Sequence, residues 1–280
     1  MEDRYVPNET IQPVRLICFD VDYTLLTDEQ ILTEKTEKTL KRLQQLGMTL
    51  IIATGKNLAS TRSIVDALSL NSPLIFINGS LIQYSNGEVV YKHSIPHTIV
   101  QRILELGEQQ NMDMMLYFTE DTVIRAGGKF PHALDRYGGP SPRVVDNWDD
   151  LGDELEQVLK IIFIDGEDYQ RLEEMDGILQ ERIPTGIDMV YSLPFLLEVQ
   201  PQGVCKGAAL QQVAQMLQIP RDEIMAFGDG NNDKEMLQFA GIGVALQNAT
   251  PELKLAADHV IPSNNDEGPA DFLREYFNLR

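Results

Sequence analysis

Two aspartates separated by one residue, Asp20 and Asp22, directly follow an apolar run that begins at Leu16, and a hydroxyl group follows at Thr24. Continuous apolar residues are typical of a short strand buried on both faces of a parallel sheet, so the two carboxylates would lie where this strand ends. Burying both without partners would cost on the order of several kcal/mol. The pattern therefore predicts a cation between them, and a metal ion is the obvious candidate.

A second acidic segment, residues 228–233 (GDGNND), follows another apolar run and carries Asp229 and Asp233. Magnesium prefers oxygen ligands and keeps several waters, so one or two carboxylates and a substrate phosphate usually suffice to hold it. Asp20 and Asp229 could share one such ion. Any one aspartate could instead cap a helix or lie in solvent, but the set of acidic groups at strand ends favours a Mg²⁺ site.

Spacing excludes an EF-hand calcium loop, which needs glycine at position 6 and glutamate at position 12. Counted from Asp20, these positions are Leu25 and Ile31, and the count from Asp229 fails in the same way. The sequence also lacks the GxxxxGK[ST] pattern of a phosphate-binding P-loop. Two common alternatives for an acidic or phosphate-binding site are therefore ruled out.

The elements that must position these residues alternate between apolar strands and helices at both ends of the chain. This rhythm predicts an α/β fold with a Rossmann-like parallel sheet and right-handed crossovers. Polar residues follow the strands at the carboxyl ends, where ligand sites of open α/β sheets lie. The expected strands cover residues 16–19, 48–53, 74–77, 224–227, 242–246 and 259–261, and the expected helices cover residues 33–47, 58–68, 206–217, 234–240 and 270–276.

The middle of the chain has a different pattern. Residues 81–84 and 89–91, joined through Asn86 and Gly87, have the features of a β-hairpin, and further short strands and helices follow. We therefore expect an inserted α+β cap domain at residues 83–194. The core would be discontinuous, with one sheet built from residues 1–82 and 195–280.

Charge and composition limit the range of partners. The chain has 280 residues with 43 acidic and 23 basic side chains, and its net charge of -20 argues against nucleic acid or an anionic membrane as partner. No segment approaches the roughly 20 apolar residues of a membrane span, and no secretory signal is recognisable, so we expect a cytoplasmic location. The two cysteines, Cys18 and Cys205, are expected to be small core residues.

Four motifs resemble those of the haloacid dehalogenase superfamily and occur in the order found in that family. The DxDxT motif matches residues 20–24, and the threonine or serine motif matches Thr54 in IIATGK. The lysine motif matches Lys206 in GVCKG, and the GDGxND motif matches residues 228–233. An α/β cap between the second and third motifs is similar to the Cof-type subfamily.

This resemblance implies a Mg²⁺-dependent phosphatase that acts on a small phosphorylated metabolite, such as a sugar phosphate, through an aspartyl-phosphate intermediate. Asp20 would be the nucleophile, and Asp22 would be the general acid and base and would offer its backbone carbonyl to the metal. Asp233 would either contact the metal through water or orient Lys206. The implied phosphoryl-binding residues are Thr54, Gly55, Lys206 and Asn232, and the implied metal site comprises Asp20, Asp22, Asp229 and Asp233.

Three residues depart from the pattern of the family. Tyr23 stands where glycine is usual, Lys56 where arginine often follows, and Gln247 where glycine is common. Two alternative functions stay open beside hydrolysis. The same site could transfer the phosphoryl group to an alcohol, as a phosphotransferase or mutase, or the chain could be a regulator that binds a phosphorylated ligand without turnover.

Overall fold

The strands of the core form a parallel sheet of five strands in the order β14-β13-β12-β1-β2. The computed structural model describes residues 13–128, 139–165, 169–193 and 196–279. Because β1 pairs with both β2 and β12, the two ends of the chain build one sheet, as the sequence predicts. The strands are β1 (Leu16–Phe19), β2 (Thr49–Ile52), β12 (Ile224–Gly228), β13 (Ile242–Leu246) and β14 (His259–Ile261).

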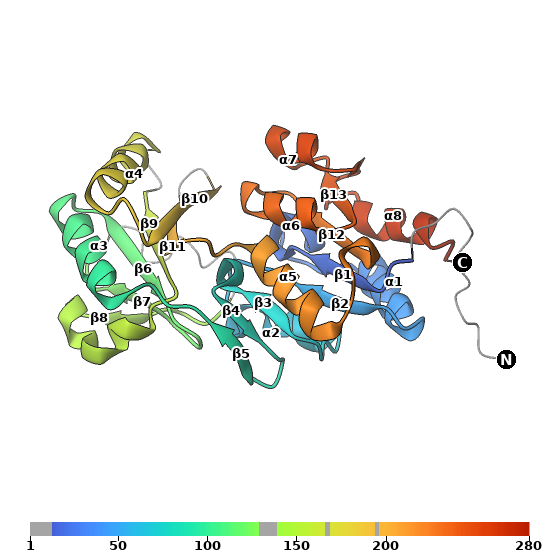
Figure 1. Ribbon diagram of the computed structural model, residues 1–280, viewed down its shortest axis with the longest axis horizontal. Coiled ribbons are helices and arrows are strands. Elements are labelled where there is room, and N and C mark those ends of the chain that lie inside the picture. Colours follow the sequence, from blue (N-terminus) through green and yellow to red (C-terminus); the bar gives the residue numbers. More distant parts are fainter. Residues whose placement is uncertain (1–12, 129–138, 166–168, 194–195, 280) are drawn as a thin grey trace.

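Helices flank this sheet, with α1 packed beside α8 and α5 beside α6 (Figure 1). The α1 helix begins where expected, since the Thr33 side chain accepts a hydrogen bond from the backbone N–H of Thr36 at 3.2 Å. One short helix, α7, was not expected from the sequence. The helices are α1 (Glu34–Gln45), α2 (Leu58–Ala67), α5 (Lys206–Leu217), α6 (Lys234–Phe239), α7 (Pro251–Ala256) and α8 (Gly268–Tyr276).

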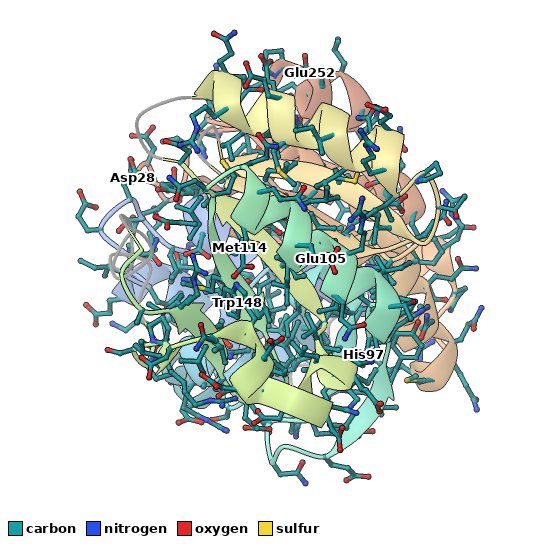
Figure 2. All side chains as sticks on the ribbon, turned by 90° about the vertical axis from the view of Figure 1, so that its left-hand side faces the viewer. Asp28, His97, Glu105, Met114, Trp148 and Glu252 are labelled. Atoms are coloured by element: carbon teal, nitrogen blue, oxygen red, sulfur yellow. The ribbon has the colours of Figure 1, made fainter. Side chains whose placement is uncertain are left out.

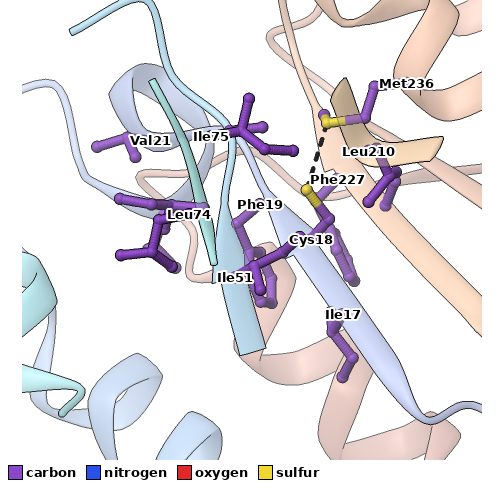
Figure 3. Close-up of a cluster of buried hydrophobic side chains, with 14 of the residues drawn as sticks. Ile17, Cys18, Phe19, Val21, Ile51, Leu74, Ile75, Leu210, Phe227 and Met236 are labelled. Atoms are coloured by element: carbon purple, nitrogen blue, oxygen red, sulfur yellow. Dashed lines mark hydrogen bonds between the residues drawn. The ribbon is translucent and has the colours of Figure 1, made fainter. Parts of the chain in front are cut away.

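Apolar packing around β1 fixes the position of its last residues (Figure 3). The rings of Phe19 and Phe227 stack between neighbouring strands with centroids 4.8 Å apart. The Cys18 thiol donates to the Met236 sulfur at 3.5 Å, so Cys18 is a core residue as predicted. Each fully buried large side chain stabilises the fold by about 1.5–3 kcal/mol. The carboxyl end of β1 is therefore held in a rigid, close-packed setting.

The third expected parallel strand has a different partner. β3 (Leu74–Phe76) forms a separate antiparallel sheet with β4 (Leu81–Gln83) and β5 (Val89–Lys92), and a parallel bridge between Ala53 and Ile75 connects it to the main sheet. Residues 77–79 all have positive φ, which turns the chain straight back into β4. Two of these three are not glycine, so this turn was not visible in the sequence.

The inserted part forms a second lobe around a sheet of six strands in the order β10-β11-β9-β6-β7-β8. Helices α3 and α4 cover the face of this sheet that is turned away from the core (Figures 1 and 2). Its elements are α3 (His97–Gln109), β6 (Asp113–Tyr117), β7 (Thr122–Arg125), β8 (Arg143–Val145), a 3₁₀ segment (Trp148–Gln157), β9 (Lys160–Ile164), α4 (Tyr169–Arg182), β10 (Ile187–Leu193) and β11 (Leu196–Pro201).

Alternation along the strands of this lobe divides its side chains between two faces. Met114 and Phe163 are paired neighbours that pack with α3 and α4, whereas Met115 and Ile162 pack into the same hydrophobic cluster as the core strands. Glu198 on β11 lies opposite Ile162 and therefore shares the face that is turned to the core. This inner face brings charged side chains of the insertion next to the carboxyl ends of the core strands.

Strand pairing gives boundaries of the insertion that differ from residues 83 and 194. The β4–β5 hairpin pairs with β3, so it stays with the core lobe, and β11 pairs with β9 and β10, so it belongs to the inserted sheet. We therefore propose that the insertion begins after Lys92 and ends at Pro201. A hairpin pattern in a sequence does not reveal which sheet it joins.

None of the helices in the described ranges has the length and apolar character that a bilayer span requires.

The tight turn after β3 can be tested with two glycines of similar backbone conformation. Gly79 has a φ of +101°, and a Cβ on it would lie 2.6 Å from the Cys205 carbonyl oxygen, whereas Gly87, with a φ of +91°, has no atom within 4 Å of its Cβ position. We expect Gly87→Ala to lower the free energy of unfolding by about 1 kcal/mol and Gly79→Ala by about 3 kcal/mol, because the clash adds to the backbone strain. Urea denaturation measures both, and equal losses would contradict the close approach of this turn to α5.

Candidate active site

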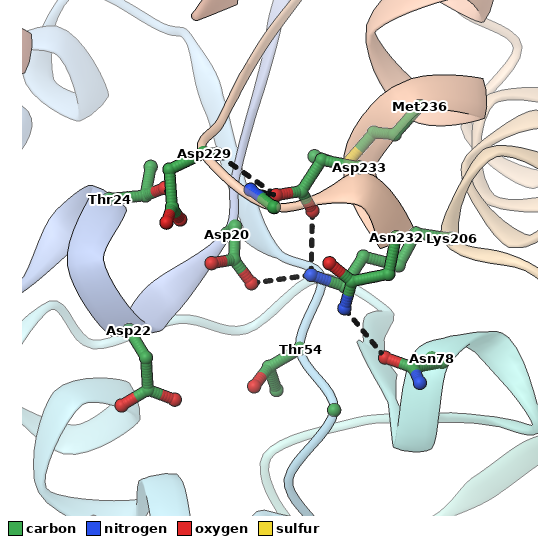
Figure 4. A network of polar contacts seen from close by, with 12 residues as sticks. Asp20, Asp22, Thr24, Thr54, Asn78, Lys206, Asp229, Asn232, Asp233 and Met236 are labelled. Atoms are coloured by element: carbon green, nitrogen blue, oxygen red, sulfur yellow. Dashed lines mark hydrogen bonds and ion pairs between the residues drawn. The ribbon is translucent and has the colours of Figure 1, made fainter. Parts of the chain in front are cut away.

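A buried ion-pair network lies at the carboxyl end of β1. Asp20 is 7% exposed, and its backbone N–H donates to the Phe227 carbonyl at 2.9 Å. The Lys206 ammonium, at the first residue of α5, donates to Asp20 Oδ1 at 2.5 Å and to Asp233 Oδ1 at 2.6 Å (Figure 4). Lys206 is 1% exposed, so its charge depends on these two carboxylates.

Asp233 uses both of its carboxylate oxygens in structural contacts. Besides the ion pair with Lys206, its Oδ2 accepts hydrogen bonds from the backbone N–H groups of Asp229 at 3.0 Å and Gly230 at 2.9 Å. Asp233 therefore folds the acidic loop and aims the lysine at Asp20. Of the two roles expected for Asp233, these contacts favour the orientation of Lys206.

Asp229 completes an acidic cluster with Asp20 and Asp233, whose carboxylate oxygens lie within 4.8 Å of one another. Thr24 Oγ1 donates to Asp229 Oδ1 at 2.7 Å. Burial raises the pKa of Asp20 to about 7 although Lys206 opposes this shift, and burial together with the Asp20 and Asp233 charges raises the pKa of Asp229 well above its ordinary value. When all three carboxyl groups are ionised, they exceed the single lysine in charge, and a hard divalent cation, which prefers oxygen ligands, would fit this cluster.

The Asp22 carboxylate lies outside this cluster and points away from Asp20 (Figure 4). It pairs with the Lys56 ammonium at 2.7 Å, and Lys56 also donates to Gln30 Oε1 at 3.2 Å. A metal contact from Asp22 would therefore have to use its backbone carbonyl, as the resemblance implies. Lys56, one of the three departures from the family pattern, is thus the partner of the expected general acid.

Tyr23, the residue between Asp22 and Thr24, adopts a left-handed conformation with a φ of +60°. Its carbonyl accepts a hydrogen bond from Asn248 Nδ2 at 2.8 Å, which connects the turn after β1 to the loop after β13. A side chain in this conformation costs about 1 kcal/mol relative to glycine. Glycine is usual at this position of the family because it adopts this backbone conformation without that cost. Gln247, the third departure, is exposed in the neighbouring loop.

Thr54 follows β2 beside Asp20 and is fixed through its backbone. Its N–H donates to the Ile75 carbonyl at 3.0 Å, its carbonyl accepts from the Asn78 N–H at 2.9 Å, and its side chain lies next to Asp20 and Lys206 (Figure 4). Asn232 donates from Nδ2 to Asn78 Oδ1 at 3.2 Å. Thr54, Lys206 and Asn232 therefore surround the space in front of Asp20, as a phosphoryl group would require.

Three residues near the site were not identified as functional from the sequence. These residues are Asn78, Lys160 and Glu198. The sequence does mark Lys160 and Glu198 as unusual, because each is a charged side chain within an apolar run, KIIFI and LLEV respectively. A charge in such a run is expected to be buried and to need a partner. Both charged residues are at most 4% exposed.

Cys205 is not the core residue that the sequence suggested. It is partly exposed at the N-terminus of α5, where its sulfur accepts a hydrogen bond from the Ala208 N–H at 3.3 Å. Cys205 therefore caps the helix that begins with Lys206. It also lines a cleft of about 420 Å³ between the two lobes, together with Lys206, Asn232, Asp188 and Gln180.

Known proteins resemble this chain over most of its length. A family model described as haloacid dehalogenase-like hydrolase matches residues 17–273. The 5-amino-6-(5-phospho-D-ribitylamino)uracil phosphatase YitU of Bacillus subtilis is 30% identical over 273 residues, covering 94% of this chain and 98% of that protein. An HMP-PP phosphatase of Escherichia fergusonii is 33% identical over 249 residues, covering 88% of this chain and 89% of that protein.

Solved structures show the same architecture over nearly the whole length. A haloacid dehalogenase-like hydrolase from Bacteroides thetaiotaomicron has a TM-score of 0.83 at 25% identity, covering 94% of this chain and 99% of its own. The protein TM0651 from Thermotoga maritima has a TM-score of 0.82 at 28% identity, with coverages of 94% and 97%. With the family model matched from β1 to α8, the resemblance to this family is confirmed, and this chain belongs to the haloacid dehalogenase-like hydrolases.

Proposed function

We propose that the chain is a Mg²⁺-dependent phosphatase that hydrolyses a small phosphorylated metabolite through an aspartyl-phosphate on Asp20. The observation that carries this proposal is the buried Asp20 carboxylate, held by Lys206 and adjacent to Asp229 at the carboxyl end of β1. Relatives whose names describe phosphatases of small metabolites support this substrate class.

In the first step, a carboxylate oxygen of Asp20 attacks phosphorus and the bond from phosphorus to the ester oxygen breaks. Asp22 gives its proton to the leaving oxygen, so the alcohol departs neutral. The Asp22 carboxylate that forms then has the Lys56 ammonium beside it at 2.7 Å. The reaction is thereby divided into two displacements, each with a lower barrier than direct attack by water.

In the second step, a water attacks the phosphorus of the aspartyl-phosphate and gives its proton to Asp22. The bond between phosphorus and the Asp20 oxygen breaks, inorganic phosphate leaves, and both aspartates return to their starting states. Thr54, Lys206 and Asn232 would hold the phosphoryl oxygens during both steps, because their side chains lie around Asp20 (Figure 4). Stabilisation of the charge that develops on these oxygens is the largest contribution expected from such donors.

Asp20, Asp229 and the backbone carbonyl of Asp22 would hold the Mg²⁺ ion, with Asp233 ordering the loop. When bound, the ion neutralises part of the negative charge shared by the carboxylates and the phosphoryl group. The chain has a net charge of -20, so it needs this local positive charge and that of Lys206 to accept an anionic substrate. The polar cleft beside Lys206 would receive the alcohol part of the ester, which favours a hydroxylated metabolite such as a sugar phosphate.

Replacement of the nucleophile tests the reaction. Asp20→Asn keeps the shape of the side chain but removes its nucleophilic charge, so we expect phosphate release to fall at least about a thousand-fold. The measurement is phosphate release over a set of small phosphate esters with Mg²⁺, and acid-quenched wild type should carry phosphate that hydroxylamine removes. Asp66→Asn is the matched control, because that side chain is 65% exposed and far along α2 from the site. An unchanged rate for Asp20→Asn would show that the nucleophile lies elsewhere.

Protons should compete with Mg²⁺ in the acidic cluster. Because the pKa of Asp20 without metal is raised to about 7, binding below that pH must displace a proton, so affinity falls as pH falls. Between pH 8 and pH 6 we expect the Mg²⁺ dissociation constant to rise at least about ten-fold. Calorimetry in buffers of different ionisation enthalpy counts the protons released, and Asp20→Asn should release fewer. An affinity that is equal at both pH values would argue against Asp20 as a ligand.

A further inference from the structure

The insertion contributes a buried lysine that the mechanism above does not use. Lys160 begins β9 and is 1% exposed. Its ammonium donates to the Gly55 carbonyl at 2.8 Å and to Glu198 Oε2 at 3.0 Å, and it lies over the Tyr117 ring at 4.3 Å from the centroid. Gly55 belongs to the core and directly follows Thr54. The Lys160 side chain of the insertion therefore binds the backbone of the expected phosphate-binding loop.

Glu198 extends this contact to a second loop of the site. Its Oε2 also accepts a hydrogen bond from Asn78 Nδ2 at 2.6 Å, and Asn78 Oδ1 accepts from Asn232 Nδ2 at 3.2 Å. Asn78 further donates its backbone N–H to the Thr54 carbonyl at 2.9 Å. Two strands of the insertion, β9 and β11, are therefore connected to both loops that would hold the phosphoryl group.

The fit around Gly55 is close. A Cβ on this residue would lie 3.1 Å from Asn78 Oδ1 and 3.4 Å from Lys160 Nζ. The Thr54–Gly55 segment is thus held from three sides: Thr54 N–H by Ile75, Thr54 carbonyl by Asn78, and Gly55 carbonyl by Lys160. The core supplies the first two of these contacts, and the insertion supplies the third.

A gain in stability alone does not account for the buried ion pair between Lys160 and Glu198. Removing two charges from water costs about as much as their attraction returns, and a buried ion pair can often be replaced by apolar residues without loss of stability. A pair of this kind does fix geometry, because each partner left alone would be an unpaired buried charge. Lys160 and Glu198 therefore select one position of the insertion over the core.

We propose that Lys160 is a positioning residue for phosphoryl transfer, which holds the Gly55 carbonyl, and with it Thr54, in working geometry when the insertion is seated on the core. This inference rests on the proposed role of Thr54. Seating of the insertion and completion of the phosphate site are then one event. An insertion that has moved away leaves the loop with two of its three contacts and leaves Asn78 without its carboxylate partner.

Lys160→Met tests this proposal, since methionine keeps the apolar stem and removes the donor. Arg171→Met is the matched control, because Arg171 pairs with Asp165 at 2.5 Å and has its other contacts within the insertion. We expect Lys160→Met to lower kcat about ten-fold or more, because small displacements of positioning groups have large effects on rate. The decrease in kcat should be equal for acetyl phosphate and for larger phosphate esters. Lys160→Met should also bind inorganic phosphate, in the presence of Mg²⁺, about ten-fold more weakly than wild type. Arg171→Met should keep both values and lose only thermal stability.

Three outcomes would overturn the proposal. A folded Lys160→Met with the wild-type kcat and phosphate affinity would show that the contact has no role in the loop. A loss confined to larger esters would show that Lys160 contacts the alcohol part of the substrate. If Lys160→Met does not fold, the double variant Lys160→Met/Glu198→Gln removes the unpaired carboxylate, and a folded double variant with the wild-type kcat would overturn the proposal in the same way.

The failure of the proposed function is distinguishable from the failure of this inference. If wild type binds inorganic phosphate with Mg²⁺ but turns over no ester, hydrolysis is excluded and the phosphate affinity of Lys160→Met alone decides the role of Lys160. If wild type neither binds phosphate nor releases it, both proposals are overturned. If wild type is active, Asp20→Asn is inactive and Lys160→Met matches wild type, only the inference about Lys160 fails.

Discussion

The ion pair between Lys206 and Asp20 is the interaction on which the rest of the structure depends. The lysine is 1% exposed and is shared with Asp233, so its charge persists in the interior only while both carboxylates are in place. Asp20 follows β1, Lys206 begins α5, and Asp233 lies in the loop after β12. A parallel sheet with β1 beside β12 is the arrangement that brings them to one edge, because parallel strands end on the same side.

Two aspartates only two residues apart have opposite environments, and this difference separates their expected roles. Asp20 is buried at the end of a strand and paired with Lys206, whereas Asp22 is partly exposed beside Lys56. The left-handed conformation of Tyr23 helps to turn the chain between them. Neighbouring carboxyl groups with distinct surroundings are what a site needs when one group must attack and the other must carry a proton.

Much of this could be predicted from the sequence, because the core strands are continuous apolar runs that end in polar residues. The bounds of β1 were predicted to the residue, and the acidic loop at residues 228–233 lies where the motif placed it. The partners of β3 and β11 could not be predicted, since strand pairing depends on turns and on residues distant in sequence. Lys160 and Glu198 were missed for the same reason: each looks like an isolated charge in a strand until their pairing across β9 and β11 is known.

The position of β1 in the middle of its sheet has a consequence for synthesis on the ribosome. Its partner β2 emerges soon after it, but β12 begins at Ile224, after the entire insertion has been made. During that interval one edge of β1, with its unpaired N–H and C=O groups and apolar side chains, stays open to solvent or to other chains. Nascent chains that pause within the insertion would therefore be prone to aggregation, and chaperones that cover exposed strands would matter most at this stage.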